Sequence, residues 1–317
     1  MTLDLKARVS QMRYESPTVL SLELVPAEPG ERFPDYGPGA HIDLELGGTL
    51  RRSYSLHALP DGARYAIAVH RAPDSRGGSA FVHDRLRVGD LVAISRPKNN
   101  FRLDETAEHT VLIGGGIGVT PLLCMARRLT KIGASWTFHL AARNRSSAAL
   151  LADLTALHGA GGTVVAHFDD EAGGFLDLAQ VVKSAPADSH FYCCGPIPMM
   201  NAFKAATSKV NSRFVHVEYF SAQDEVAREG GFEVVLARQG RSLFIPPGKT
   251  ILEILVHEKV NVPFACSNGV CGTCETHVLE GTPDHRDSFL TDDEKAGNAS
   301  MMVCCSGSRT ARLVLDL

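Results

Sequence analysis

The chain has 317 residues, of which 44% are hydrophobic and 21% charged, and its formal net charge is −4. This length gives room for two or three domains with cores of their own. A surface that binds nucleic acid needs an excess of basic side chains to neutralise phosphates. The composition has no such excess, so we expect no nucleic-acid partner.

Two further observations concern where the chain works. Residues 1–8 carry charges where a signal peptide needs an apolar core, and the most apolar stretch, residues 111–125, is interrupted by four glycines and a proline. We therefore expect a cytoplasmic protein with no membrane partner. In that compartment the eight cysteines would serve thiolate chemistry rather than disulfides.

The first third of the chain has the pattern of short strands. Residues 19–24, 41–46 and 64–69 alternate apolar and polar side chains, and clusters of glycine and proline separate them. Closely spaced, half-buried strands of this kind usually close into an antiparallel β-barrel.

From about residue 110 the pattern changes to buried strands alternating with helices. We expect strands at 110–113, 136–142, 162–168, 190–194 and 214–220, and a helix at 119–129. This alternation predicts a doubly wound α/β domain with a mostly parallel sheet.

The last third follows a polar segment, residues 221–231, that ends in two glycines and is typical of a linker. Beyond it we expect strands at 232–237, 242–245, 276–279 and 312–317 and a helix at 251–257. The predicted domains are a barrel at 1–104, an α/β domain at 105–222, a linker at 223–231 and an α+β domain at 232–317.

Three cysteines near the carboxyl end are spaced as C-x4-C-x2-C: Cys266, Cys271 and Cys274. This spacing is that of a plant-type [2Fe–2S] loop, and Cys304 is the natural fourth ligand. The same cysteines could instead bind zinc, form disulfides or line a buried apolar cluster. Structural zinc usually takes two C-x-x-C-like pairs, which this chain lacks, so the sequence favours iron and sulfide.

A glycine-rich segment at residues 114–121 ends the first α/β strand and opens the helix after it. Its glycines allow a tight turn, and they let the backbone approach a pyrophosphate at the helix N-terminus. The loop lacks the third glycine of G-x-G-x-x-G, and no acidic residue stands at the expected ribose position. A purely structural turn is the alternative.

A second strand-to-helix turn, Cys194-Gly195-Pro196, is a weaker signal by itself because such turns are common. In a doubly wound sheet the two loops would sit at neighbouring strand ends, around the crevice where ligands bind. The pair therefore indicates a dinucleotide site.

In the barrel third, residues 51–56 offer cations, an aromatic ring and hydroxyls on one strand. Arg52 is suited to a phosphate, Tyr54 to packing on a planar ring, and Ser55 to a hydrogen bond with a ring heteroatom. A solvated basic strand edge is the competing interpretation. Further on, Gly78 and Ser79 open a helical stretch and predict either an anion site or a helix cap.

The order of these motifs, R-x-Y-S, G-G-S, G-G-x-G-x-T-P, C-G-P and C-x4-C-x2-C, resembles one family along essentially the whole chain. It is similar to the phthalate dioxygenase reductases and vanillate demethylase reductases of the ferredoxin–NADP reductase superfamily. The resemblance implies an FMN-binding barrel, an NAD-binding α/β domain and a carboxy-terminal plant-type ferredoxin of β-grasp type. Benzoate-dioxygenase-type reductases instead carry their ferredoxin at the amino end and use FAD.

The resemblance also implies roles for individual residues. The expected catalytic residues are Ser55, Phe220 and Cys194, with Ser55 near the reactive flavin nitrogen and Phe220 beside the flavin. The FMN contacts would be Arg52, Ser53, Tyr54, Ser55, Gly77, Gly78, Ser79 and Phe220. The nicotinamide nucleotide would contact Gly115, Gly116, Gly118, Thr120, Pro121, Cys194, Gly195 and Pro196. The cluster ligands would be Cys266, Cys271, Cys274 and Cys304.

Some positions depart from the family pattern. Cys305 adjoins the fourth cluster ligand, and Cys193 adjoins Cys194. Arg143 and Arg145, after the second α/β strand, are suited to a 2′-phosphate, whereas the resemblance favours NADH over NADPH.

Together these features predict an NADH-dependent flavin iron–sulfur oxidoreductase. A hydride carries two electrons and the cluster accepts one, so a flavin is needed between them. The expected acceptor is a separate oxygenase, a Rieske non-haem iron enzyme in particular. A reductase for a cytochrome P450, a general ferric or quinone reductase, and a non-enzymatic redox sensor remain as alternatives.

The ferredoxin third also has a candidate docking patch for that acceptor. Its members are the acidic residues Asp284, Asp287, Asp292, Asp293 and Glu294. Such a patch could steer a basic partner. A solvated helix surface accounts for it nearly as well.

Overall fold

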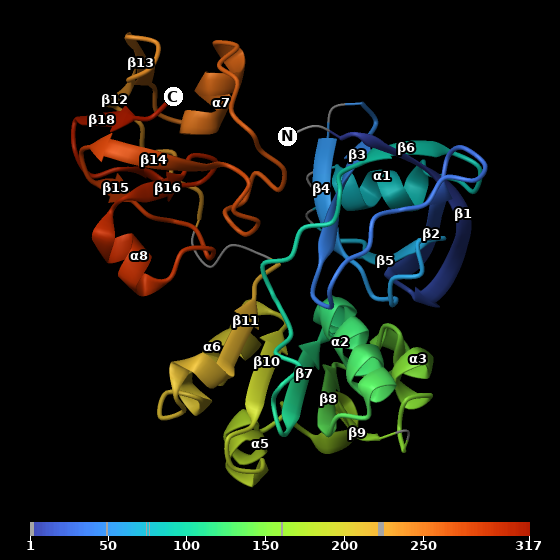
Figure 1. Ribbon diagram of the computed structural model, residues 1–317. Helices are drawn as coiled ribbons and strands as arrows, with labels where there is room; N and C mark the ends of the chain where they lie inside the picture. Colours follow the sequence, from blue (N-terminus) through green and yellow to red (C-terminus); the bar gives the residue numbers. More distant parts are fainter. Residues whose placement is uncertain (1–2, 49, 74, 76, 160, 221–224) are drawn as a thin grey trace. The chain divides into compact units, whose positions relative to one another are not determined.

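The computed structural model describes residues 3–48, 50–73, 75, 77–159, 161–220 and 225–317 (Figure 1). The residues form two compact units, each with most of its contacts inside itself, and the boundary lies between Glu218 and Tyr219. Residues 223–224 of the predicted linker lie outside the described residues. The first unit contains an antiparallel and a parallel sheet, and the second contains a mixed sheet.

The antiparallel sheet of the first unit has six strands in the order β4-β3-β6-β1-β2-β5. They are β1 (Leu5–Ser16), β2 (Val19–Pro26), β3 (His41–Leu46), β4 (Leu50–Ser55), β5 (Tyr65–His70) and β6 (Leu91–Ile94). Just beyond β4, Leu56 bridges Ile67 and the His57 N–H donates to the Ala66 carbonyl over 3.0 Å. The sheet thereby closes into the expected barrel.

The barrel core comes from one face of each strand. Ile42, Leu44 and Leu46 alternate along β3 and are fully buried, and they pack with Leu22 and Leu24 of β2. The short helix α1 (Gly78–Asp84) packs against β3, β4 and β5. The predicted flavin motif on β4 thus lies between the barrel core and a helix.

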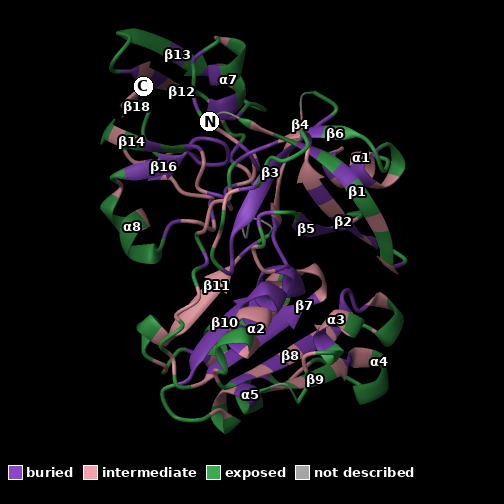
Figure 2. Cartoon of the chain, turned by 45° about the vertical axis from the view of Figure 1, so that its right-hand side comes forward, coloured by how far each residue is buried: buried purple, intermediate pink, exposed green. Residues whose placement is uncertain are grey.

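The parallel sheet has five strands in the order β11-β10-β7-β8-β9. They are β7 (Thr110–Gly115), β8 (Trp136–Ala142), β9 (Gly162–Phe168), β10 (His190–Cys194) and β11 (Val215–Glu218). Its helices are α2 (Val119–Ile132), α3 (Leu151–Thr155), α4 (Asp169–Ala172), α5 (Leu178–Ser184) and α6 (Ile197–Ala206). Every residue of β7 and β10 is buried, as Figure 2 shows, because helices cover both faces of the central strands.

The strand order reverses between β7 and β10, which are neighbours although β8 and β9 come between them in sequence. In an open α/β sheet, ligands bind outside the carboxyl ends of the strands at such a switch point. The glycine-rich segment follows β7, and the Cys194-Gly195-Pro196 turn follows β10. The topology therefore brings the two predicted nucleotide loops together.

The second unit is built on a five-stranded sheet in the order β13-β12-β18-β14-β16 and a two-stranded sheet, β15-β17. The strands are β12 (Phe232–Leu236), β13 (Arg241–Ile245), β14 (Glu275–Glu280), β15 (Pro283–Asp284), β16 (Ser300–Met302), β17 (Gly307–Ser308) and β18 (Arg312–Leu315). The helices are α7 (Ile251–His257) and α8 (Asp292–Gly297). Antiparallel hairpin β12-β13 with parallel β18 beside β12 gives the expected α+β arrangement.

Local chemistry explains where α7 begins. The Thr250 hydroxyl accepts from the Glu253 N–H over 3.1 Å, and the Glu253 carboxylate accepts from the Thr250 N–H over 3.0 Å. This reciprocal capping box satisfies two donors at the helix start. Within the described part of the chain, no helix is both long and apolar enough to span a bilayer.

Candidate redox site

The two nucleotide loops touch through their backbones. β7 and β10 pair in parallel register, with Gly114 opposite Cys194. A Cβ added to Gly118 would lie 2.2 Å from the Cys194 carbonyl oxygen and 2.8 Å from the Gly195 nitrogen. No side chain fits in that space, so glycine at 118 is what lets the loops meet.

Met199, in the first turns of α6, packs against a glycine of each loop. A Cβ added to Gly115 would lie 2.5 Å from the Met199 sulfur, and one added to Gly195 would lie 2.7 Å from it. Met199 was not among the predicted site residues. The sequence feature that could have identified Met199 is its position one helical turn after the predicted Cys194-Gly195-Pro196 loop.

The start of α2 is arranged to receive an anion. Gly116 has a φ of 55°, in the left-handed region that favours glycine. The Thr120 hydroxyl donates to the Ile117 carbonyl over 2.9 Å, and Pro121 lies in the first turn of the helix. Gly118, at the N-cap, has no side chain to satisfy the first N–H groups of α2. Those groups suit phosphate oxygens.

A carboxyl group stands next to the second loop. Cys194 is fully buried, and Glu218 lies opposite it in β11. Burial raises the pKa of Glu218 to about 8, and its Oε2 atom is shielded from solvent with no hydrogen-bond partner among the described residues. Burial, together with Glu218 and Cys193, also raises the pKa of Cys194 well above its ordinary value.

Sequence reasoning missed Glu218. The signal was weak, because Glu218 ends a strand that already contains the polar His216. It was passed over since a strand end is an ordinary place for a charge.

On the flavin strand, Arg52 and Gly78 lie in contact. A Cβ added to Gly78 would lie 2.5 Å from Arg52 Cγ and 2.9 Å from its Nε. A guanidinium and the first turn of α1 therefore meet at one point, which suits a phosphate group. The geometry brings two of the predicted FMN contacts together.

Other predicted flavin residues have partners within the protein. The Ser53 hydroxyl donates to Asp43 Oδ1 over 2.6 Å, and Lys98 pairs with Asp43 Oδ2 at 2.5 Å. The Ser79 hydroxyl donates to the Ser75 hydroxyl over 2.9 Å and accepts from the Ala72 N–H. These two hydroxyls stabilise the barrel and the loop before α1.

Three further residues of the predicted flavin site are Ser55, Gly77 and Phe220, and their surroundings differ. Ser55 ends β4 and is buried opposite His41 of β3. Gly77 has a φ of 90°, which explains a glycine just before α1. Phe220 is 36% exposed and belongs to the unit that starts at Tyr219. Its position beside the flavin stays a prediction.

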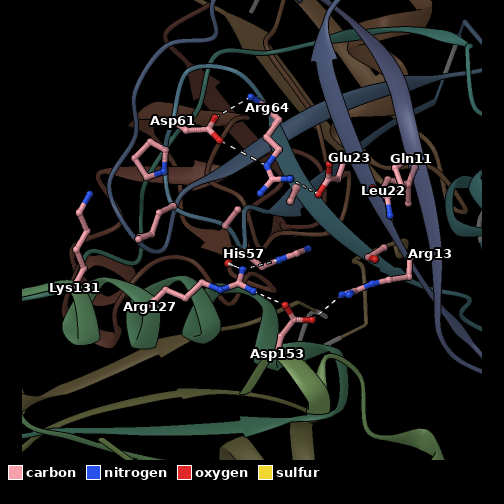
Figure 3. Close-up of a pocket in the computed structure, with 15 residues that line it drawn as sticks. Gln11, Arg13, Leu22, Glu23, His57, Asp61, Arg64, Arg127, Lys131 and Asp153 are labelled. Carbon is pink, nitrogen blue, oxygen red and sulfur yellow. Dashed lines mark hydrogen bonds and ion pairs between the residues drawn. The ribbon is translucent and has the colours of Figure 1, made fainter. Parts of the chain in front are cut away.

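A network of ion pairs joins α2 to the segment that follows the flavin strand (Figure 3). Arg127 donates to the His57 carbonyl over 2.7 Å and pairs with Asp153 at 2.5 Å, and Arg13 of β1 pairs with Asp153 at 2.6 Å. The Cys124 thiol donates to the Ala58 carbonyl over 2.9 Å. α2, which opens at the nucleotide loop, is thus fixed to the barrel.

These groups border a cavity of about 540 Å³, and none of its described lining residues was predicted to contact a cofactor. Arg64, also in its wall, pairs with Glu23 at 2.7 Å. The charges around it therefore largely neutralise one another, and the network serves as a support rather than a ligand site.

In the second unit, three of the four predicted ligand sulfurs approach one another. A hydrogen bond to the Cys266 sulfur, together with burial, raises the pKa of Cys271 well above its ordinary value. Cys266 is also hydrogen-bonded to Cys304. The pairing of Glu275 with Met302 between β14 and β16 places Cys274 beside the segment that carries Cys304.

Backbone N–H groups point at these sulfurs. The Asn268 N–H donates to Cys266 Sγ over 3.4 Å, and the Gly269 N–H donates to Cys304 Sγ over 3.2 Å. Such bonds stabilise thiolates and tune a cluster's potential. A Cβ on Gly269 would lie 2.5 Å from Cys305 Sγ, so the loop needs glycine there.

This donor set fits a [2Fe–2S] cluster. Cys266, Cys271, Cys274 and Cys304 are 7% exposed or less, and four thiolates in one loop system are what two irons require. Among the described residues, no three His, Cys, Asp or Glu side chains are placed to hold a single metal ion.

The predicted acidic patch is wrong in part. The Asp287 side chain is fully buried, and its Oδ2 accepts from the Leu290 N–H over 2.7 Å. Asp284 pairs with Arg286 at 2.7 Å. Asp292, Asp293 and Glu294 form the first turn of α8, where carboxylates are common. Nearness in sequence hid the fact that Asp287 turns inward to hold its own loop.

In comparisons with known proteins, two family models match separate parts of the chain. Residues 112–205 match the family model of the oxidoreductase NAD-binding domain, and residues 234–307 match that of the 2Fe-2S iron-sulfur cluster binding domain. The solved structure of phthalate dioxygenase reductase, described as modular and as transferring electrons from pyridine nucleotides to [2Fe-2S], is 36% identical with a TM-score of 0.78. The match covers 99% of this chain and 98% of that one.

The chain belongs to the phthalate dioxygenase reductase family. A phenoxybenzoate dioxygenase subunit beta of Ectopseudomonas oleovorans is 50% identical, over 98% of this chain and 96% of that protein. A tetrachlorobenzoquinone reductase of Sphingobium chlorophenolicum is 46% identical, over 98% of this chain and 97% of that protein. The family resemblance and the fold class predicted from the sequence are confirmed.

As a member of this family, the chain is an NADH-dependent flavin iron–sulfur oxidoreductase. Its cofactors are FMN and a [2Fe–2S] cluster, and its electron donor is NADH. The arginine and helix start at Arg52 and Gly78 fit the FMN phosphate, and the loops around Gly118 fit the dinucleotide.

Proposed function

We propose that this reductase passes electrons from NADH through FMN and the [2Fe–2S] cluster to a Rieske non-haem iron oxygenase that acts on an aromatic or similar small organic acid. The relatives include a subunit named for a dioxygenase, and the chain covers nearly the whole of that relative. The observation that carries the proposal is that one chain holds both an oxidoreductase NAD-binding domain and a buried four-cysteine loop in a 2Fe-2S cluster binding domain.

We assign the three functional modules to residues 1–104, 105–222 and 232–317. In the first, Arg52 and Gly78 would hold the FMN phosphate, and Tyr54 and Ser55 would contact the flavin ring. FMN supplies the chemistry that accepts a hydride and releases electrons singly. The segment that precedes β12 is hydrogen-bonded to the third module: the Ala227 N–H donates to the Cys305 carbonyl over 2.8 Å.

In the second module, the glycine loops would orient the nicotinamide nucleotide, and Cys194 and Glu218 would line the inner wall of that site. Cys194 has no exposed surface, so its part of this wall would be a low-dielectric environment. Electrostatic interactions that orient a charged nucleotide would be stronger there.

The test of the acceptor uses the reduced holoprotein. It should be mixed anaerobically with a Rieske oxygenase, with a cytochrome P450 and with ferric citrate, and the absorbance of each acceptor followed. The proposal predicts rapid bleaching of a Rieske centre at low micromolar concentration. Faster reduction of the P450 heme than of every Rieske protein tried would contradict it.

Direct quinone reduction is a second candidate, because a relative 46% identical is named as a tetrachlorobenzoquinone reductase. Quinones accept electron pairs and could take them at the flavin. If this is the main activity, replacement of Cys271 by Ser will leave NADH-dependent quinone reduction at full rate. If the oxygenase is the acceptor, the same substitution will abolish substrate turnover in the coupled system.

A further inference from the structure

The carboxyl end of β8 has two arginines and no acid, but the structure brings an acid there from the neighbouring strand. β8 ends at Ala142 and leads to Arg143 and Arg145. β9 runs parallel beside it, ends at Phe168 and leads into α4, which contains Glu171. Because the two strands are parallel, the two connections leave the sheet at the same edge, and Figure 2 shows α4 next to β9.

Specific contacts join the two connections. The Asp170 N–H donates to the Arg143 carbonyl over 3.1 Å. Arg145 donates from Nε and Nη2 to the two carboxylate oxygens of Glu171, each over 3.3 Å. The Arg145 guanidinium also lies 4.5 Å from the centre of the Phe168 ring. Arg145 thus contacts both an acid and an aromatic ring.

This edge is where a dinucleotide would place its adenosine ribose. The switch point between β7 and β10 fixes the pyrophosphate, and the ribose then reaches the end of the second strand, here β8. An acid at this position bonds the ribose 2′-hydroxyl of NADH, whereas an arginine binds the 2′-phosphate of NADPH. Arg145 and Glu171 present both groups, with side chains 64% and 54% exposed.

We propose that Glu171 determines the preference of this protein for NADH over NADPH. Its carboxylate accepts from the ribose 2′-hydroxyl, and its pairing with Arg145 withholds that guanidinium from a 2′-phosphate. A 2′-phosphate would also meet the negative charge of Glu171 directly. The inference rests on the proposed function, since it concerns the nucleotide used in the same reaction.

The test compares coenzymes in the full-length holoprotein. Glu171→Gln keeps the size of the side chain and removes its charge, so Arg145 becomes available to the 2′-phosphate. The ratio of kcat/KM for NADPH to that for NADH, measured with a two-electron dye, should rise about tenfold, the gain expected from one charge-assisted hydrogen bond. Adding Arg145→Ala to this variant should remove the gain.

Asp170→Asn is the matched control, because it removes a neighbouring charge from the same helix without touching the Arg145 pair. Its coenzyme ratio should change less than about twofold, as expected of an exposed charge without a specific contact. An unchanged ratio in Glu171→Gln, a gain that survives Arg145→Ala, or the gain appearing in Asp170→Asn instead would each overturn the inference.

A binding measurement separates this inference from the proposed function. Calorimetric titration with adenosine 2′,5′-bisphosphate and with ADP needs no turnover, and Glu171→Gln should tighten the first relative to the second by a similar factor. Wild-type protein that oxidises neither nucleotide would refute the proposed function. Wild-type protein that oxidises NADH, with no change in relative affinity in Glu171→Gln, would refute the role of Glu171 alone.

Discussion

The cysteine loop of the second unit and the glycine loops of the first are suited to their ligands in opposite ways. In the cysteine loop the side chains are the ligands, so the spacing of Cys266, Cys271 and Cys274 is itself the signal. In the glycine loops the missing side chain matters, since a Cβ on Gly118 would collide with the Cys194 carbonyl. A site made of ligands is therefore easier to recognise from sequence than one made by close approach of two backbones.

The largest expected effect is on the ligand side of this comparison. Cys271→Ser should abolish the cluster and with it NADH-dependent reduction of cytochrome c, a one-electron acceptor. NADH oxidation with a two-electron dye should continue, because the predicted flavin and nucleotide residues other than Phe220 lie in the other unit. Both rates are measured on one preparation, and equal loss of both would contradict the order of electron flow.

Cys305→Ser is the matched control for the cluster. Its thiol is buried next to the ligand loop, but the Gly269 N–H points at Cys304 instead. Iron and sulfide content should stay at the wild-type level in Cys305→Ser and fall to background in Cys304→Ser. The reverse pattern would reassign the fourth ligand.

Glu218 tests whether a carboxyl group with a raised pKa beside the glycine loops affects stability. Its pKa is about 8 in the folded chain against 4.5 as an ordinary value, so between these pH values only the folded chain keeps the proton. Stability should therefore fall as pH rises through this window, by up to about 1.4 kcal/mol for each pH unit. Glu218→Gln should remove the fall.

The measurement for Glu218 is urea unfolding followed by the fluorescence of Trp136, the chain's single tryptophan, which is buried in the same sheet. The difference in unfolding free energy between about pH 5 and about pH 8 is compared in wild type and variant. The same pH dependence in both proteins would show that Glu218 ionises normally.

On the backbone side, Gly118→Ala should force the two nucleotide loops apart. A displacement of about 1 Å in a positioned reactant can cost roughly 100-fold in rate, so we expect a fall of that order in kcat/KM for NADH. Gly174→Ala is the control, since nothing lies within 4 Å of its added Cβ. Similar kinetics in the two variants would remove the backbone contact from the site.

The smallest effect is expected at the flavin phosphate. Arg52→Ala should weaken FMN binding about tenfold, the loss expected for one charge-assisted contact. Arg51→Ala, one position along β4, should retain FMN. Flavin fluorescence during titration of the FMN-depleted protein measures both, and equal affinities would place the phosphate elsewhere.

Strands and helices whose apolar residues recur at regular spacing could be predicted from the sequence. Those with few buried residues at irregular spacing could not. β8 and β9 agree with the predicted strands to the residue, because each is a short run with clear boundaries. β1 was not predicted: of its 12 residues only Ala7, Val9 and Ser16 are buried, so its alternation is weak. Helices α3 and α5 were also not predicted, because each is too short to show a clear helical spacing of apolar residues.

For the site, the sequence predicted groups that would act through their own chemistry and offered no signal for those that act through tertiary contacts. The Arg127–Asp153 pair joins residues that are 26 positions apart, and the Arg13–Asp153 pair spans 140 positions. Glu171 reaches Arg145 only because β9 lies beside β8. Neither arrangement has a local sequence pattern, since the sheet creates it.

The most direct test of the account is anaerobic rapid mixing of the holoprotein with NADH, followed at flavin and cluster wavelengths. The account predicts that flavin absorbance falls first, that the cluster is reduced afterwards, and that protein stripped of FMN shows no cluster reduction. Cluster reduction at an undiminished rate in the FMN-free protein would contradict it.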